Sequence, residues 1–202
     1  MQMGDTIDLT DGQGFLYQAF INEANPKKCG FSIVDKKEIP IRDFSIAIAI
    51  APTKNMDRTE WFVEKAVEIG IDKIHLLLCK NSERKTVNQD RLHKIAVSAM
   101  KQSGQARLPH ITEMIPFKEA MSFEAEQKFI CYVDISNPDQ LKTLAKPNQS
   151  YLVLIGPEGD FNKEEMQLAT ESGFKKVSLG PNRLRTETAA LTACQILNFV
   201  NL

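Results

Sequence analysis

Hydrophobic and polar residues alternate over residues 1–45 in the manner of β-strands. Ile7 and Leu9 lie on one face of a first strand, and a polar turn at residues 11–14 precedes a second strand. Another polar turn at residues 25–28 precedes a third. Short alternating runs separated by polar turns are typical of antiparallel hairpins. We therefore expect a small antiparallel β module that is too short to close a barrel and is incomplete at its N-terminal side.

From residue 46 onward, strand-like and helix-like runs follow one another. The run at residues 73–79 is apolar almost throughout, as in strands that are buried on both faces of a parallel sheet. This alternation predicts an α/β fold with a mostly parallel sheet flanked by helices over residues 46–202. The other strands are expected near residues 46–50, 111–114, 129–133, 151–155 and 175–179, and the helices at 57–69, 89–102, from 162, and 187–201.

Residue types at the helix ends support these boundaries. Asp57 and Glu60 have capping-box spacing, as do Asn162 and Glu165, and Gly70 has the position of a C-terminal stop. The helix over residues 187–201 is apolar nearly all round. Such a helix is buried either in the core of its own chain or against another subunit.

Two predicted strands end in loops that contain glycine and proline. The first loop, "GPEGD", covers residues 156–160, and the second, "GPNRLRTET", covers residues 180–188. In a parallel sheet both loops lie at the edge where ligands bind. Neither contains the lysine of a phosphate loop or a GxGxxG motif, and Pro157 lacks an N–H that a phosphate would need. These loops therefore suit a flat, uncharged ring, with ordinary tight turns as the alternative.

Composition and charge narrow the class of protein. The chain has 202 residues and a net charge of −1, so binding of nucleic acid by bulk charge is not expected. Basic residues nevertheless cluster, and they form either a solvated surface or a local phosphate-binding face. The four cysteines are scattered and the histidines have no metal-ligand spacing. With no membrane span and no signal peptide, we expect a cytoplasmic protein with free thiols and no metal.

The two glycine loops extend into longer motifs that together are specific. "LIGPEGDFNKEE" and "VSLGPNRLRTETAALTA" resemble the signature of the SPOUT class of RNA methyltransferases. Within that class the chain is similar to the ribosomal RNA small-subunit methyltransferase E family, which methylates N3 of a uridine in 16S rRNA. The stretches "KNMDRTEWFVEKAVEIGIDKI", "NSERK" and "KQSGQARLPHI" match the family pattern in the same order, so the resemblance covers nearly the whole chain.

Three features depart from the family pattern. Asp160 replaces a second glycine after Gly159, and Lys101 stands where the family usually has glutamate. The N-terminal module lacks the family's first strand and its arginine-bearing segment. The third departure bears most directly on RNA binding.

The resemblance implies a fold and a set of partners. It implies a partial PUA-like β-barrel module that binds RNA over residues 1–45 and a SPOUT methyltransferase domain over residues 46–202. The SPOUT domain would contain a C-terminal trefoil knot that binds S-adenosylmethionine. The resemblance also implies a homodimer with its active site at the subunit interface, acting on 16S rRNA of the small ribosomal subunit.

The resemblance also assigns roles to residues. Arg185 is the first choice for a cation near the reacting base, and Glu187 or Glu158 is the proton acceptor or orients Arg185, although Glu187 could equally cap the helix start. The expected cofactor-binding residues are Leu154, Ile155, Gly156, Pro157, Glu158, Gly159, Leu179, Gly180, Leu184, Thr188 and Ala189. The expected RNA-binding residues are Lys54, Ser82, Arg84, Gln102, Arg107 and Arg183.

Two other functions remain open from the sequence. One is a SPOUT methyltransferase that acts on a different RNA, such as tRNA or large-subunit rRNA. The other is a non-catalytic RNA-binding module that has kept the fold. Binding of S-adenosylmethionine separates the second from the enzymes, and assays on separate RNAs separate the enzymes from each other.

Overall fold

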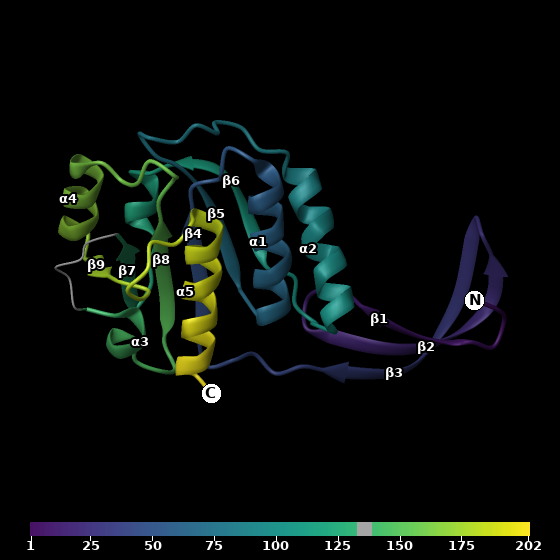
Figure 1. Ribbon diagram of the computed structural model, residues 1–202. Coiled ribbons are helices and arrows are strands. Elements are labelled where there is room, and N and C mark those ends of the chain that lie inside the picture. The colour runs from purple at the N-terminus through teal and green to yellow at the C-terminus, as the bar shows by residue number, and fades with distance from the viewer. Residues whose placement is uncertain (133–138) are drawn as a thin grey trace.

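The computed structural model describes residues 1–132 and 139–202, and it contains two β-sheets (Figure 1). The last residue of the predicted strand 129–133 lies outside the described residues. A three-stranded sheet has the order β1-β2-β3, and a six-stranded sheet has the order β6-β5-β4-β8-β7-β9. The first belongs to the N-terminal module and the second to the α/β domain.

The N-terminal sheet is antiparallel, as the alternating pattern predicts. Its strands are β1 (Thr6–Thr10), β2 (Phe15–Asn25) and β3 (Lys28–Glu38). The sheet extends away from the α/β domain (Figure 1) and does not close into a barrel over the described residues. Several of its large apolar side chains are exposed, namely Phe20, Phe31, Ile33 and Val34.

The six-stranded sheet is parallel at each pairing between neighbouring strands. Its strands are β4 (Ser45–Ile50), β5 (Lys73–Leu78), β6 (His110–Pro116), β7 (Gln127–Cys131), β8 (Ser150–Ile155) and β9 (Lys175–Val177). The predicted mostly parallel α/β sheet is therefore confirmed. Because parallel strands all run in the same direction, their carboxyl ends share one edge of the sheet.

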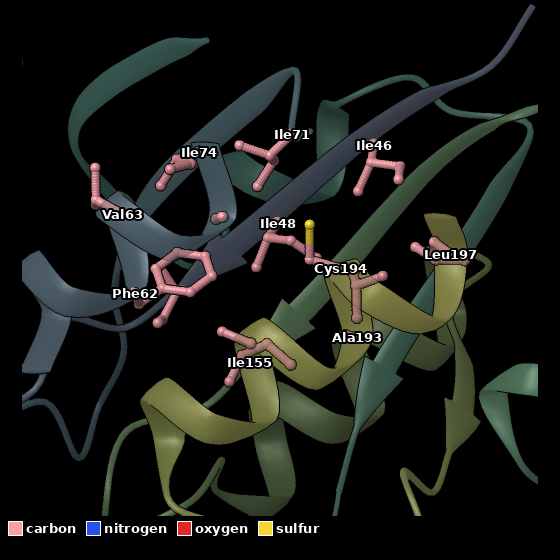
Figure 2. Packing of buried hydrophobic residues seen from close by; sticks show 14 of the residues in the cluster. Ile46, Ile48, Phe62, Val63, Ile71, Ile74, Ile155, Ala193, Cys194 and Leu197 are labelled. Atoms are coloured by element: carbon pink, nitrogen blue, oxygen red, sulfur yellow. The ribbon is translucent and has the colours of Figure 1, made fainter. Parts of the chain in front are cut away.

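Alternate residues of the sheet face two separate hydrophobic clusters. Ile46, Ile48 and Ile50 of β4 pack under α1 (Met56–Ile69), α2 (Gln89–Ser103) and α5 (Thr186–Val200). Figure 2 shows side chains from β4, α1 and α5 meeting in this cluster. Ala49 and Ala51 face the opposite cluster, which is covered by η1 (Glu119–Ser122) and α4 (Lys163–Glu171). The period of two along β4 thus assigns one helical layer to each face. The short helix α3 (Leu141–Leu144) precedes β8.

One of the two predicted capping boxes is confirmed and the other is wrong. Asn162 caps α4, and its side-chain oxygen accepts from the Glu165 N–H at 2.7 Å while Glu165 accepts from the Asn162 N–H at 3.0 Å. Helix α1 instead begins one residue earlier than predicted, with Asn55 as its cap accepting from the Asp57 N–H at 3.1 Å. Asparagine caps a helix as well as aspartate does, so both residue types are suitable. Asn55 is the cap because it lies directly before the first turn of the helix.

The other helix boundaries agree closely with the sequence pattern. Gly70 ends α1 in the left-handed region, with φ of 105°, as predicted. Helix α5 buries one face through Ala190, Ala193 and Leu197, whereas Phe199 is 64% exposed. The apolar residues of α5 are therefore only partly covered by the chain's own core.

The cysteines are all free thiols, as predicted. Cys79 and Cys194 are buried, Cys131 is half-buried and Cys29 is exposed. Burial raises the pKa of the Cys194 thiol to about 12, so this thiol stays protonated and unreactive near neutral pH. Among the described residues, no helix is long and apolar enough to cross a membrane, and no group of three metal-ligating side chains is found.

His75 of β5 supplies a test of the core through pH. The side chain is buried, and its ring lies 4.4 Å from the ring of Phe123. Burial lowers the pKa of His75 from 6.5 to about 4, so the folded protein resists protonation that the unfolded chain accepts. The stability that neutral His75 contributes is therefore complete above pH 6.5 and is lost as pH falls towards 4.

Between pH 7 and pH 4, we expect the unfolding free energy of the wild-type protein to fall by about 2–3 kcal/mol more than that of His75→Gln. Denaturant unfolding at several pH values measures this difference. His93→Gln, at an exposed position on α2, is the matched control and should follow the wild-type curve. Parallel curves for wild type and His75→Gln would contradict a depressed pKa for His75.

Candidate functional site

A pocket of about 700 Å³ opens at the carboxyl edge of the six-stranded sheet. It is lined by the loops that follow β7, β8 and β9 and by the first turns of α1 and α5. Its lining residues are Arg58, Cys131, Tyr132, Gln140, Ile155, Gly156, Pro157, Glu158, Asp160, Val177, Ser178, Leu179, Gly180, Pro181, Asn182, Arg183, Leu184, Arg185, Thr186 and Ala189. This volume is within the range of roughly 300–1,000 Å³ that small-molecule sites occupy.

The strand order sets the side of the pocket on which each loop lies. Strands β4, β8, β7 and β9 are successive neighbours in the sheet. Arg58 follows β4, and Glu158 follows β8, so both lie towards one end of the pocket. Cys131 ends β7 and Val177 ends β9, and they lie towards the other end. Arg183 and Arg185 follow β9, so charged groups come from both sides of the pocket, while Cys131 and Val177 add apolar contacts on the β7 and β9 side.

A hydrogen bond joins the two glycine loops that the sequence singled out. The Thr186 hydroxyl, in the first turn of α5, donates to the Gly156 carbonyl at 3.1 Å. Thr186 is buried and Gly156 is half-buried, so this bond is partly shielded from water. The start of α5 and the end of β8 are thereby held together as one wall of the pocket.

Gly156 packs closely against the core beside the pocket. A Cβ at this position would lie 3.2 Å from two ring atoms of Phe161, which is closer than a normal contact. Phe161 is buried, and its ring centroid lies 5.4 Å from that of Phe117. Glycine thus lets the loop after β8 approach the Phe161 ring. The same loop lines the pocket, so this contact acts on the pocket only through the position of the loop.

Asp160 adopts a backbone conformation that glycine adopts more easily. Its φ is 61°, in the left-handed region where aspartate is tolerated. Its Oδ1 atom accepts from the Phe161 N–H at 2.8 Å, and the Asn81 amide donates to its carbonyl at 3.0 Å. These bonds hold the residue that replaces the family's second glycine.

The loop after β9 is fixed by its own hydroxyl group. Ser178 Oγ accepts from the Gly180 N–H at 3.2 Å and donates to the Gly180 carbonyl at 2.9 Å. Gly180 has a φ of 134°, which favours glycine. Strand β9 ends at Val177, two residues earlier than predicted, because Ser178 forms an isolated bridge with Gln140.

The predicted cofactor-binding residues fall into two groups. Eight of them line the pocket: Ile155, Gly156, Pro157, Glu158, Leu179, Gly180, Leu184 and Ala189. Leu154, Gly159 and Thr188 do not line it. Leu154 is fully buried in the cluster on the far face of β8, because neighbouring strand residues point to opposite faces. A Cβ at Gly159 would instead face Asn81, at 3.1 Å.

The three predicted catalytic residues occupy different environments. Arg185 is exposed at the N-cap of α5 and lines the pocket. Glu158 is also exposed and lines the pocket, and its Oε1 accepts from the Lys54 N–H at 3.0 Å. Glu187 is buried behind the pocket wall, and its Oε1 lies 3.9 Å from Nε of Arg58.

The predicted RNA-binding residues include two with structural roles. Ser82 is buried, and its hydroxyl accepts from the Cys79 N–H at 3.0 Å. Arg107 donates to the carbonyls of Gln13 at 2.8 Å and Ile39 at 2.9 Å, which fastens the N-terminal module to the α/β domain. We assign both residues to the fold, because their polar groups are already used there.

The other four predicted RNA-binding residues are exposed or near the surface. Lys54 forms an ion pair with Glu83 at 2.7 Å, and Arg84 donates to the Lys54 carbonyl. Gln102 is exposed on α2, and Arg183 is exposed at the pocket. Lys54 and Arg84 therefore form a joined basic rim between the loops after β4 and β5.

Sequence reasoning missed several pocket residues that come from distant segments. Arg58 lies in the stretch "KNMDRTEW", but nothing in its spacing relates it to the glycine loops. Cys131, Tyr132 and Gln140 come from the β7 side, for which no functional role was predicted. These residues reach the pocket because their strands are neighbours in the sheet, although they are far from the glycine loops along the chain.

Comparison with known proteins identifies relatives over most of the chain. Residues 40–198 match the RNA methyltransferase domain family. The ribosomal RNA small subunit methyltransferase E of Mesomycoplasma hyopneumoniae is 31% identical over 157 residues, which cover 74% of this chain and 67% of that protein. The relative from Rickettsia conorii with the same name is 26% identical over 198 residues, covering 96% and 80%.

A solved structure has the same fold at higher identity. The crystal structure of a probable rRNA-methyltransferase from Porphyromonas gingivalis is 42% identical, with a TM-score of 0.93, and covers 100% of this chain and 87% of that one.

Proposed function

The chain belongs to the RNA methyltransferase domain family, and within it to the ribosomal RNA small subunit methyltransferase E family; from this premise we propose that it uses S-adenosylmethionine to methylate N3 of a uridine in 16S rRNA. One observation carries the proposal. The two family motifs meet at a single pocket, where Thr186 of one motif donates to Gly156 of the other. Structures of relatives bind S-adenosylmethionine, as the 25% identical enzyme from Neisseria gonorrhoeae does.

The composition of the pocket fits this cofactor. Its apolar lining, with Cys131, Val177, Leu179, Leu184 and Ala189, provides contacts for a flat adenine ring. Its charged lining offers both signs of charge, which a zwitterionic amino-acid tail and a sulfonium require. Pro157 has no N–H, and the loop after β8 has no lysine for a phosphate. The pocket therefore favours a nucleoside with an amino-acid tail over a nucleotide.

The reaction needs a proton acceptor and a cation beside the base. N3 of uracil is an imide nitrogen that must lose its proton before it can attack a methyl group, and the negative charge then spreads over both ring carbonyl oxygens. S-adenosylmethionine supplies an electrophilic methyl group and leaves as the neutral thioether. Glu158 lines the pocket and is exposed, so we assign it the role of proton acceptor. Arg185, also at the pocket, is a cation for the developing charge.

The proposal carries the family's architecture with it. Residues 1–45 would form the partial PUA-like RNA-binding module, and residues 46–202 the SPOUT domain with its C-terminal trefoil knot. Strands β1 to β3 and the parallel sheet that begins at Ser45 support this division. The close tie between the loops after β8 and β9 supports the placement of the knot there.

Cofactor binding and a panel of RNAs test the function. Calorimetry should show binding of S-adenosylmethionine and S-adenosylhomocysteine, and no comparable binding of a nucleoside triphosphate. Transfer of a labelled methyl group should occur to small ribosomal subunits or 16S rRNA, but not to large subunits or tRNA. Mass spectrometry of the product nucleosides should identify 3-methyluridine. If only tRNA or large subunits are labelled, the enzyme is a methyltransferase that acts on that RNA instead. If the protein does not bind the cofactor, it is a non-catalytic RNA-binding module.

We further propose that the enzyme is a homodimer that uses the outer face of α5. Phe199 is exposed on this helix, and Leu191 and Ile196 are half-buried. Light scattering at micromolar concentration should give twice the mass of one chain. Phe199→Glu should shift the protein towards the monomer, whereas Phe31→Glu, on the exposed N-terminal sheet, should leave its mass unchanged. A wild-type protein that stays monomeric at this concentration contradicts the dimer.

Arg185→Ala separates three roles for this arginine. A transition-state role predicts that single-turnover methyl transfer at saturating RNA and cofactor falls by about 100-fold or more, with cofactor affinity little changed. A contact to RNA phosphate predicts weaker RNA binding with a preserved saturating rate. We expect the first result. A saturating rate near that of the wild type removes Arg185 from the chemical step.

A further inference from the structure

Arg58 and Glu187 form an incomplete ion pair on the β4 side of the pocket. Arg58 is in the first turn of α1 and lines the pocket, and its side chain is 39% exposed. The Glu187 side chain is only 10% exposed. Its Oε1 lies 3.9 Å from Nε of Arg58, which is beyond hydrogen-bond distance, and its buried Oε2 has no hydrogen-bond partner among the described residues.

Burial makes this carboxylate a strong attractor for the guanidinium. A buried charge is costly unless it is paired, and Arg58 is the cation that the structure places beside Glu187. Glu187 lies in the first turn of α5, where the helix N-terminus adds a partial positive charge. Arg58 is thus oriented from behind by a fixed negative charge, while its other N–H groups remain available towards the pocket.

The position of Arg58 in the sheet order relates it to the reacting end of the pocket. Arg58 is on the β4 side, and the apolar residues Cys131 and Val177 end the strands on the β7 and β9 side. A cofactor bound with its ring against Cys131 and Val177 extends towards Arg58 and Glu158 with its remaining groups. The target base must approach that end of the pocket to meet the methyl group.

We propose that Arg58, oriented by Glu187, binds a ring carbonyl oxygen of the target uracil and stabilises the anion that forms when N3 loses its proton. This inference rests on the proposed function, and it makes Arg58 a catalytic residue and Glu187 a positioning residue. The guanidinium replaces water as the partner of the negatively charged oxygen, and it needs little reorganisation because Glu187 already orients it. The substrate class is therefore a pyrimidine imide whose anion forms beside Arg58 in the pocket.

The role differs from that of an arginine used for structure or for phosphate. Arg91 offers a matched comparison, because it forms an ion pair with Glu60 of α1 at 2.6 Å but does not line the pocket. Arg185 lines the pocket but has no ion pair among the described residues. Of these three arginines, Arg58 is the one that both lines the pocket and lies beside a carboxylate.

The first test compares variants in single-turnover methyl transfer at saturating RNA and S-adenosylmethionine. Arg58→Ala should lower the rate by about 100-fold or more, and Arg58→Lys should restore part of it because the positive charge returns. Glu187→Gln should lower the rate by roughly tenfold, since the guanidinium loses its orienting charge. Arg91→Ala, the control, should retain the wild-type rate. Thermal unfolding and cofactor titration show whether each variant is folded.

The pH profile of the same reaction reports on the anion. The charged and titratable side chains that line the pocket are Arg58, Cys131, Tyr132, Glu158, Asp160, Arg183 and Arg185, and Glu187 lies behind Arg58. A nearby cation lowers the pKa of the N3–H group, so its loss should move the rising limb of the rate to higher pH by about one to three units. Arg91→Ala should not move this limb.

A more acidic base gives the decisive comparison. In 16S rRNA transcribed with 5-fluorouridine, N3 loses its proton more readily, so the rate defect of Arg58→Ala should become at least tenfold smaller than on ordinary RNA. Glu158→Gln removes the proton acceptor. Its rate defect on the two RNAs serves as a reference for the loss of a group other than the cation. A structural role for Arg58 predicts the same defect on both RNAs.

Each other outcome overturns the inference. A saturating rate near that of the wild type, with weaker RNA binding, assigns Arg58 to phosphate. Cofactor affinity lowered at least tenfold with a preserved saturating rate assigns Arg58 to the carboxylate of the cofactor. A slow variant with unchanged pH profile and no relief on 5-fluorouridine RNA assigns it to structure. If the wild-type protein neither binds the cofactor nor methylates RNA, the proposed function fails before Arg58 is tested.

Discussion

The hydrogen bond from Thr186 to the Gly156 carbonyl is the contact on which the site depends. It joins two loops that are separated along the chain but follow strands of one parallel sheet. Because the Thr186 side of the bond is buried, breaking it leaves polar groups without their partner and removes a tie between α5 and the end of β8. The charged groups of the pocket are placed from this junction, since Arg185 and Glu187 flank Thr186 directly. A single side-chain bond thus sets the position of both the cofactor loops and the charged groups beside Thr186.

Most of the fold follows from local patterns in the sequence. The alternation of strand-like and helix-like runs and the apolar run of β5 predicted the sheet, and the Asn162–Glu165 capping box predicted the start of α4. The pattern was wrong where two local signals competed. Asn55 and Asp57 are both good caps, and propensity alone does not decide between them. A knot, in contrast, is a property of the path of the whole chain, and no local pattern encodes it.

The site was predictable only where a motif contains it. Eight of the eleven expected cofactor-binding residues line the pocket, and they belong to the two glycine-loop motifs. Leu154 faces away from the pocket because of the alternation of a strand, and the chain order gave no reason to connect Arg58 with Glu187. Arg107 resembles an RNA-binding residue in sequence, yet its guanidinium fastens two modules by main-chain carbonyls. Charge alone does not tell a ligand contact from a structural one.

The ion pairs of the basic residues separate the pocket arginines from several others in a chain with a net charge of −1. Arg42, Lys54, Lys65 and Arg91 are neutralised by neighbouring carboxylates. Arg183 and Arg185 have no such partner among the described residues, and Arg58 has only the incomplete pair with Glu187. The pocket also contains the acidic side chains of Glu158 and Asp160, so it offers both signs of charge to a ligand. Attraction between exposed charges falls off within about 10 Å at moderate salt, so these groups act on a ligand at the pocket itself and the net charge of the whole chain matters little there.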